Sequence, residues 1–131
     1  SKVDIMDAKQ HDYILSITSH IPHLVAYNIV TTSINIQDEK QSAIVKYSAG
    51  GLRDFTRIAA SNPIMWRDIF IQNKKNTSKE IEKFIANLED LKNAIENEDG
   101  KKLEEIFIKT KKIRKEIIKA GQDVSKPDFG R

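Results

Sequence analysis

The segment YSAGGLRDFTRIAASNPIMWRDIFIQN, from Tyr47 to Asn73, places charged side chains within an otherwise apolar sequence. Asn62–Pro63 has the order of a helix N-cap followed by proline at the first helical position. Gly50–Gly51 supplies a flexible or left-handed backbone point before the preceding helical run. The segment therefore predicts two short helices, one on each side of Ser61.

The first of these helices has an apolar face and a charged face. At about 100° per residue, Arg57 lies near the middle of the charged face. Arg53 stands four residues before it, a like-charge spacing that Asp54 offsets only in part. Two interpretations stay open at this point: an anionic ligand between the arginines, or a solvated face with an ordinary Asp–Arg pair. The apolar face consists of Leu52, Phe55, Ile58 and Ala59, and the charged face also includes Ser61.

The upstream stretch HDYILSITSHIPHLVA, from His11 to Ala26, predicts a long helix with a kink. Asp7 is suited to cap this helix, with Gln10 at the capping-box position. Pro22 removes one backbone hydrogen bond and crowds the preceding turn, so we expect the kink near His20. One face is apolar and the other polar, which suits a helix between a core and a ligand cavity. The apolar face holds Ile14, Ile17, Ile21, Val25 and Asn28, and the polar face holds Ser16, Ser19, His20, His23 and Tyr27.

The last third of the chain predicts two matched amphipathic helices. Thr77–Glu80 fits a capping box, and the short polar link Asn97–Gly100 allows an antiparallel hairpin with both apolar stripes in a core. The expected fold is all-α: a kinked long N-terminal helix, short central helices and this hairpin. We expect one domain over residues 1–121 and a polar tail or linker at 122–131. The two stripes are Ile81, Phe84, Ile85, Leu88, Leu91 and Ile95, and Leu103, Ile106, Phe107, Thr110, Ile113 and Ile117.

Composition narrows the possible function classes. The 131 residues, 39% of them hydrophobic, suffice for one core, and the lack of cysteine excludes disulfides and thiolate metal sites. Residues 1–73 carry seven basic and seven acidic side chains, and the remainder carries fifteen and twelve. Because glutamates interrupt the basic run near the C-terminus, we expect no nucleic-acid partner. Without a long apolar run or signal peptide, we expect no membrane association and a cytoplasmic location.

The histidines and the tryptophan each allow a structural interpretation. His20 and His23 share a helix face, but no third ligand and no His-Glu-x-x-His motif accompany them. We therefore expect no metal and treat both as ordinary helix histidines. Trp66 is the only tryptophan, and a buried anchor is its simplest role.

Together, GGLRDFTRIAASNPIMWRDIF and HDYILSITSHIPHLVA closely resemble the C-terminal helical domain of prephenate dehydrogenases, the NAD-dependent enzymes of tyrosine biosynthesis. The resemblance spans residues 11–73 and weakens along the rest of the chain. Leu52, Ile21 and Asn62 depart mildly from the family pattern, which often has phenylalanine, leucine and aspartate there. None of these departures removes a polar group expected to touch substrate.

The resemblance implies a domain that forms part of a substrate site and a homodimer interface. The complete enzyme would transfer hydride from prephenate to NAD with loss of carbon dioxide, giving 4-hydroxyphenylpyruvate. Arg57 would bind a substrate carboxylate, Asp54 would orient Arg57, and His23 would hydrogen-bond the substrate. Trp66 would line the pocket, and Gly50–Gly51 would let backbone approach it, including the partner's pocket.

The catalytic and NAD-binding residues are not expected in this chain. It contains no Gly-x-Gly-x-x-Gly sequence, so a nucleotide-binding domain is expected elsewhere in the protein. Two alternatives stay open: an arogenate-preferring dehydrogenase, and a non-enzymatic helical dimerisation or regulatory module with the arginines in interface ion pairs. The sequence does not choose between NAD and NADP, nor does it reveal feedback regulation. A Gly-x-Gly-x-x-Gly before Ser1 would favour the enzyme.

Overall fold

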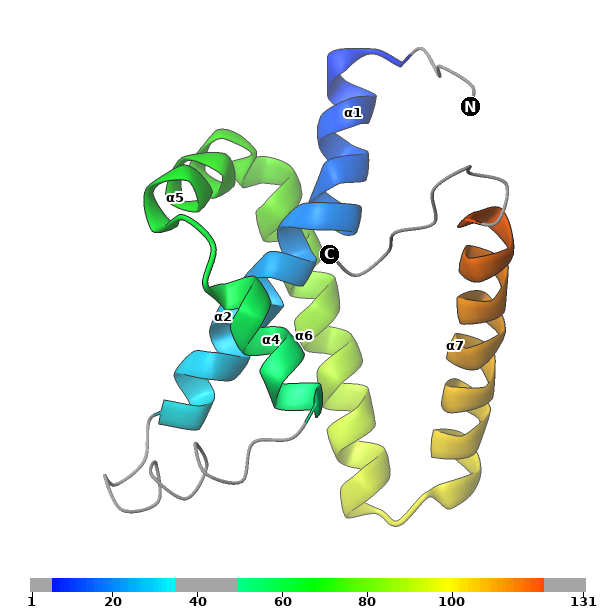
Figure 1. The fold of residues 1–131 in the computed structure, drawn as a ribbon. Helices are drawn as coiled ribbons and strands as arrows, with labels where there is room; N and C mark the ends of the chain where they lie inside the picture. The colour runs from blue at the N-terminus through cyan, green and yellow to red at the C-terminus, as the bar shows by residue number, and fades with distance from the viewer. Residues whose placement is uncertain (1–5, 35–49, 122–131) are drawn as a thin grey trace. The chain divides into compact units, whose positions relative to one another are not determined.

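The computed structural model describes residues 6–34 and 50–121, and all regular structure in these ranges is helical (Figure 1). This confirms the all-α prediction. The tail predicted at 122–131 lies outside the described residues, as do Tyr47–Ala49. The described residues divide into two units, residues 6–83 and residues from Phe84 onward. The elements are α1 (Ala8–Leu15), η1 (Ser16–His20), α2 (Ile21–Ile34), α4 (Gly50–Ala59), α5 (Pro63–Gln72), α6 (Lys74–Glu96) and α7 (Gly100–Gly121).

The N-terminal helix is distorted where the sequence predicted a kink. Asp7 caps α1 as expected, since its side chain accepts a hydrogen bond from the Gln10 backbone N–H at 2.8 Å. Between α1 and α2 the chain forms the π-helical turn η1, in which the Ile21 N–H donates to the Ser16 carbonyl. Pro22 follows directly and has no N–H to continue the regular α-helical pattern. The distortion thus takes the form of a π-turn.

The two short central helices begin and end close to the predicted positions. The Asn62 side chain accepts hydrogen bonds from the backbone N–H groups of Ile64, at 2.9 Å, and Met65, at 3.0 Å, which confirms it as the N-cap of α5. Helix α4 packs against α2 with its apolar face half-buried. Gly50–Gly51 differs from expectation, because it forms the first turn of α4 and has no left-handed backbone. Its glycines therefore extend the helix.

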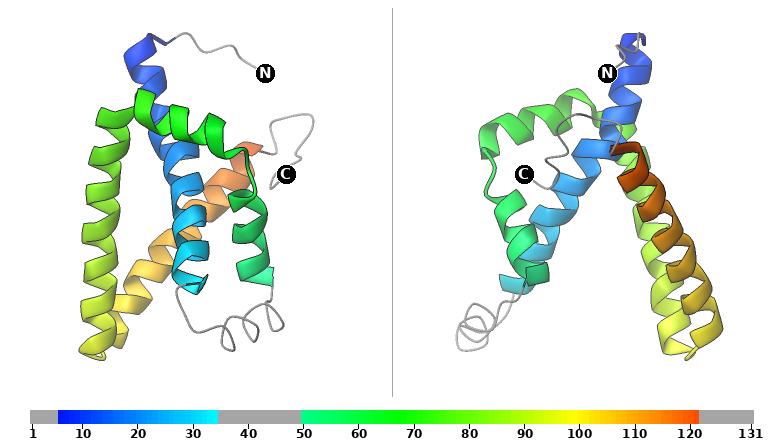
Figure 2. Two further views of the ribbon diagram at one scale, coloured as in Figure 1. Left: turned by 90° about the vertical axis from the view of Figure 1, so that its left-hand side faces the viewer. Right: turned by 45° about the vertical axis from the view of Figure 1, so that its right-hand side comes forward.

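The capping box predicted at Thr77–Glu80 is wrong. Helix α6 begins at Lys74, directly after Asn73, so Thr77 lies inside its first turns and donates its backbone N–H to the Asn73 carbonyl at 3.0 Å. The Thr77 side chain is 5% exposed. Only Asn73 separates α5 from α6, and Figure 2 shows the two helices running in different directions on either side of this junction. A sharp turn within one residue leaves no room for a separate capping segment.

The second unit contains the end of α6 and all of α7, joined by the predicted link. The two helices run antiparallel (Figure 1), and Glu98 in the link has a positive φ of 53°. The apolar stripes, however, are not a core: Leu88 is 54% exposed, for example. Two helices alone cannot enclose a core, so these side chains remain available to another surface. The exposed apolar residues of this unit are Phe84, Ile85, Leu88, Ile95, Phe107, Ile108, Ile113, Ile117 and Ile118.

No helix within the described residues combines the length and the apolar character needed to span a membrane.

Candidate functional site

The polar face of the N-terminal helix turns inward, whereas the apolar face that was expected to lie in a core is partly exposed. Ser16 is fully buried and His20 is 8% exposed, whereas Ile17 on the predicted apolar face is 44% exposed. Helix α4 packs on α2, and α5 brings its aromatic side chains to the histidines. A pattern of polar residues on one helix therefore marks an internal aromatic site here, rather than a solvated surface.

A stack of two rings forms the centre of this site. The rings of His23 and Trp66 have centroids 3.8 Å apart and planes inclined by 18°. His23 Nδ1 lies 2.9 Å from the Ser19 carbonyl oxygen, which can only accept, so Nδ1 carries the proton. In the neutral ring Nε2 is then an acceptor, and in the charged ring it is a donor. Trp66 is buried, which confirms its role as an anchor.

His20 supports the stack from the side. Its ring meets Trp66 edge-on, with centroids 6.0 Å apart, and Phe70 likewise at 6.4 Å. His20 Nδ1 lies 3.1 Å from Asn73 Nδ2. Burial lowers the pKa of His20, and the charges of His23 and His11 lower it further, while Asp12 raises it. The ring is therefore biased toward its neutral form.

A small hollow lies beside His20, with a volume of about 200 Å³. It is polar enough to hold ordered water, but too small for a substrate with a ring and two carboxylates. We treat it as part of the support of the site. Its lining residues are Asp12, His20, Ile69, Gln72 and Asn73.

The charged face of α4 is exposed, as the helical wheel predicted for Arg53, Asp54 and Arg57. Within residues 6–34 and 50–121, Asp54 and Arg57 form no ion pair, and neither makes a hydrogen bond or ring contact with the histidine–tryptophan stack. Ser61 leaves this face. It lies after the end of α4, where its carbonyl accepts a hydrogen bond from the Tyr27 hydroxyl at 3.3 Å.

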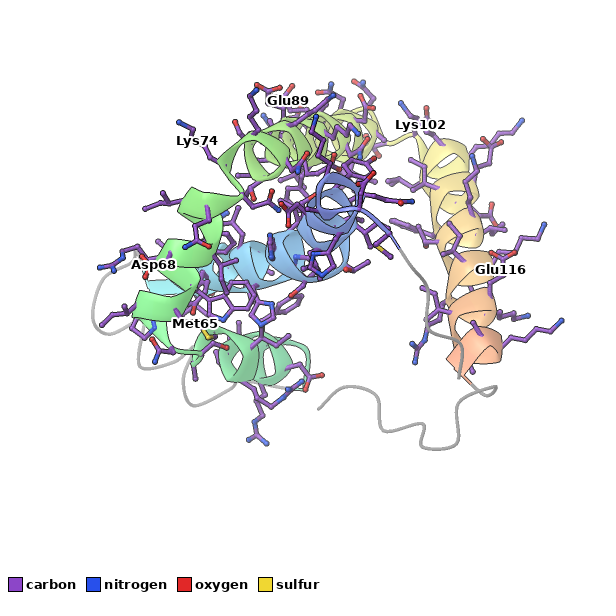
Figure 3. The ribbon with its side chains drawn as sticks, turned by 90° about the horizontal axis from the view of Figure 1, so that it is seen from above. Met65, Asp68, Lys74, Glu89, Lys102 and Glu116 are labelled. Atoms are coloured by element: carbon purple, nitrogen blue, oxygen red, sulfur yellow. The ribbon has the colours of Figure 1, made fainter. Side chains whose placement is uncertain are left out.

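Arg67 and Asp68 on α5 form an ordinary surface pair. The Arg67 Nε and the Asp68 carboxylate are 2.9 Å apart, with side chains 61% and 49% exposed. Figure 3 shows Asp68 pointing outward from α5, away from the side chains between α5 and α2. A pair so exposed contributes little to stability.

Sequence reasoning missed the role of Asn73. Its side chain contacts α1, η1 and α6 at once, through Asp12, His20 and Asn76. The sequence does show an asparagine between two helical runs. It does not show the partners of this asparagine, because Asp12 and His20 are far away in sequence. Among the described residues, no group of three or more His, Cys, Asp and Glu side chains could hold a metal ion.

An all-helical chain with an internal histidine–tryptophan site and exposed apolar helix faces has the character of a helical domain that packs against another protein surface. The chain belongs to the prephenate dehydrogenase family, because residues 7–109 match the family model described as "Prephenate dehydrogenase, dimerization domain".

Individual relatives agree with this assignment. The chain is 38% identical over 113 residues to a cyclohexadienyl dehydrogenase of Zymomonas mobilis, covering 86% of the chain and 39% of that protein. It is 34% identical over 109 residues to a prephenate dehydrogenase of Bacillus subtilis, covering 83% of the chain and 29% of that protein.

A solved structure is similar as well. The prephenate dehydrogenase of A. aeolicus, in complex with hydroxyphenyl propionate and NAD+, superimposes with a TM-score of 0.81 at 44% identity, over 88% of this chain and 40% of that one. An arogenate dehydrogenase of Synechocystis has the same fold at 20% identity, with a TM-score of 0.82 over 88% of this chain and 42% of that one. The chain thus spans about two fifths or less of the length of these relatives.

Proposed function

We propose that this chain supplies substrate-binding residues and a homodimer interface to a prephenate dehydrogenase, which converts prephenate to 4-hydroxyphenylpyruvate with NAD. The observation that carries the proposal is the stack of His23 on Trp66. Both residues match the motifs that carry the family resemblance, and they are in ring contact although they come from α2 and α5. A flat ring pair with a polar edge suits a ligand that has both a ring and acidic groups.

Arg57 is the residue best suited to the charge of the substrate. Prephenate is a dianion, and a guanidinium group recognises a carboxylate through two parallel hydrogen bonds. Arg57 lies on the exposed charged face of α4, and within the described residues it makes no ion pair. We assign Asp54 to orienting Arg57, His23 to a hydrogen bond with the substrate, and Trp66 to the pocket wall. Gly50–Gly51, which is open to solvent at the start of α4, would allow close backbone approach.

A homodimer would explain two exposed apolar surfaces. On α5, Ile64, Met65 and Ile71 are exposed although Trp66 beside them is buried. On α6 and α7 the exposed stripes of the second unit form a larger apolar surface. A family model described as a dimerization domain supports a second copy of the chain as the partner. In such a dimer the stripes would become the core that each chain lacks.

The described residues do not fit an NAD site. They contain no strand, and the chain has no glycine-rich loop to hold a pyrophosphate at a helix N-terminus. We therefore derive no step through NAD, and we expect other parts of the complete protein to bind it.

The isolated chain should not bind NAD with useful affinity. Isothermal titration of NAD into the 131-residue chain should give only the heat of dilution, because no backbone cradle is available for the phosphates. Saturable heat from a single site would contradict this division of labour between domains.

Enzyme assays on the complete protein test the proposed function directly. With NAD present, prephenate should give 4-hydroxyphenylpyruvate, measured by NADH absorbance and by chromatography of the product. Arogenate, assayed in parallel, decides between the two dehydrogenase activities. If neither substrate reduced NAD, the chain would serve a non-enzymatic dimerisation or regulatory role instead.

A further inference from the structure

Asn73 connects three parts of the first unit through one side-chain amide. Its Nδ2 donates to the Asp12 backbone carbonyl at 2.8 Å and lies 3.1 Å from His20 Nδ1. Its Oδ1 accepts a hydrogen bond from Asn76 Nδ2 at 3.0 Å. Reversing the amide would set its oxygen against the Asp12 carbonyl and its NH₂ group against that of Asn76. The surrounding groups therefore fix the orientation of Asn73.

This orientation determines the protonation of His20. An amide NH₂ group can only donate, so His20 Nδ1 must accept and the ring must be the neutral form with its proton on Nε2. A charged ring would set an N–H against the Asn73 NH₂ group. Burial acts in the same direction on the pKa of His20, as do the neighbouring charges of His11 and His23, whereas Asp12 opposes them.

The neutral His20 ring is in turn a support for Trp66. It stands almost perpendicular to the rings of Trp66 and Phe70, at interplanar angles of 84° and 89°. The His23 ring stacks on the Trp66 ring, with an interplanar angle of 18°. A chain of contacts therefore runs from Asn73 through His20 and Trp66 to His23. The groups that α5 contributes to this series of contacts are aromatic and uncharged.

We propose that Asn73 and His20 are positioning residues that hold Trp66, and through it His23, in the arrangement that binds the substrate. Neither needs to touch the substrate. The kinetic consequence rests on the proposed function, whereas the geometric consequence can be measured on the chain itself. A small displacement of binding groups is enough to weaken substrate binding. His20 can therefore affect substrate binding although it reaches His23 only through Trp66.

The geometric consequence is tested on the 131-residue chain by NMR of the His20 ring nitrogens and by Trp66 fluorescence. The native ring should show an unprotonated Nδ1 and a protonated Nε2 at pH 7. Asn73→Asp replaces the donor by an isosteric carboxylate, which should place a proton on Nδ1 and raise the pKa of His20, because a negative charge beside the ring favours its charged form. Asn73→Ala should shift the emission of Trp66, the only tryptophan in this chain. Lys74→Ala, at the exposed position on the other side of Asn73, should change neither signal.

The kinetic consequence is tested on the complete protein with the same three variants. Asn73→Ala should raise KM for prephenate about 5- to 10-fold, the factor for roughly one lost hydrogen bond, with kcat changed less than about twofold. Asn73→Asp should make KM depend on pH in the range where His20 titrates in that variant, and Lys74→Ala should behave as the native protein.

The results separate this proposal from the proposed function. Should the native complete protein fail to oxidise prephenate, the proposed function fails, but NMR and fluorescence still decide the positioning role. An Nδ1-protonated or charged native His20 at pH 7 would overturn the proposal. So would unchanged His20 and Trp66 signals in Asn73→Asp, which keeps the shape of the native side chain and serves if Asn73→Ala does not fold.

Discussion

Replacing Arg57 with alanine in the complete protein should lower kcat/KM for prephenate by about 30-fold to several thousand-fold while leaving the fold intact. Arg57 lies on the exposed face of α4, so its removal takes no side chain from the packed interior. In the substrate complex it would be one member of a desolvated charge pair, and truncating such a member costs roughly 2–5 kcal/mol. Steady-state kinetics should detect the loss, with circular dichroism to confirm folding.

Two further variants sharpen this test. Arg67→Ala removes another exposed arginine, whose partner is Asp68, and the loss of transition-state stabilisation should be less than about 1 kcal/mol. Arg57→Lys keeps the positive charge but loses the second parallel hydrogen bond, so its kcat/KM should fall between those of the native protein and Arg57→Ala. A folded Arg57→Ala protein with near-normal kcat/KM would return Arg57 to the role of a solvated surface residue.

Placing a carboxylate in the apolar stripe of α6 should dissociate the proposed homodimer. Leu88 is 54% exposed in the single chain, so Leu88→Asp costs the monomer little, whereas a dimer would bury this position. Both chains of a homodimer carry the substitution, so losing the burial of two leucines weakens association by roughly 3–6 kcal/mol, or about 150-fold to 25,000-fold in the dimer dissociation constant. An unpaired buried carboxylate adds to this loss.

Sedimentation at micromolar concentration measures the effect. The native chain should sediment as a dimer of its 15.0 kDa monomer, and Leu88→Asp should shift it to the monomer. Asn93→Asp introduces the same negative charge at an exposed position on the opposite side of α6, and should leave the dimer unchanged. A native chain that sedimented only as a monomer, or a Leu88→Asp variant that remained dimeric, would contradict an interface on this stripe.

Local signals in the sequence predicted the helices well. Asp7 and Asn62 were recognised as caps because a capping hydrogen bond joins residues two or three positions apart. Pro22 predicted a distortion near His20 because the loss of its backbone N–H is also local. Thr77 shows the limit of the same reasoning: its capping pattern was present, but the helix had already begun at Lys74.

The candidate site residues were named through family resemblance and not through local signals in the sequence. His23 and Trp66 were named through family resemblance, and the structure brings their rings into contact. The substrate-binding roles of all these residues remain predictions. Within the described residues, Arg57 and Asp54 make no contact that connects them to this stack. Asn73 was not named, since its partners Asp12 and His20 precede it by much of the chain.

The sequence by itself determined which segments are helical, where their caps and breaks lie and which family the motifs resemble. Only the tertiary structure decided that the polar face around His20 turns inward and that the Leu88 stripe stays exposed in one chain. Helical periodicity reports that a helix has two unlike faces, but it does not report which neighbour covers each face. That depends on contacts between segments distant in the sequence and, for the stripe, on the second copy of the chain in the homodimer that we propose.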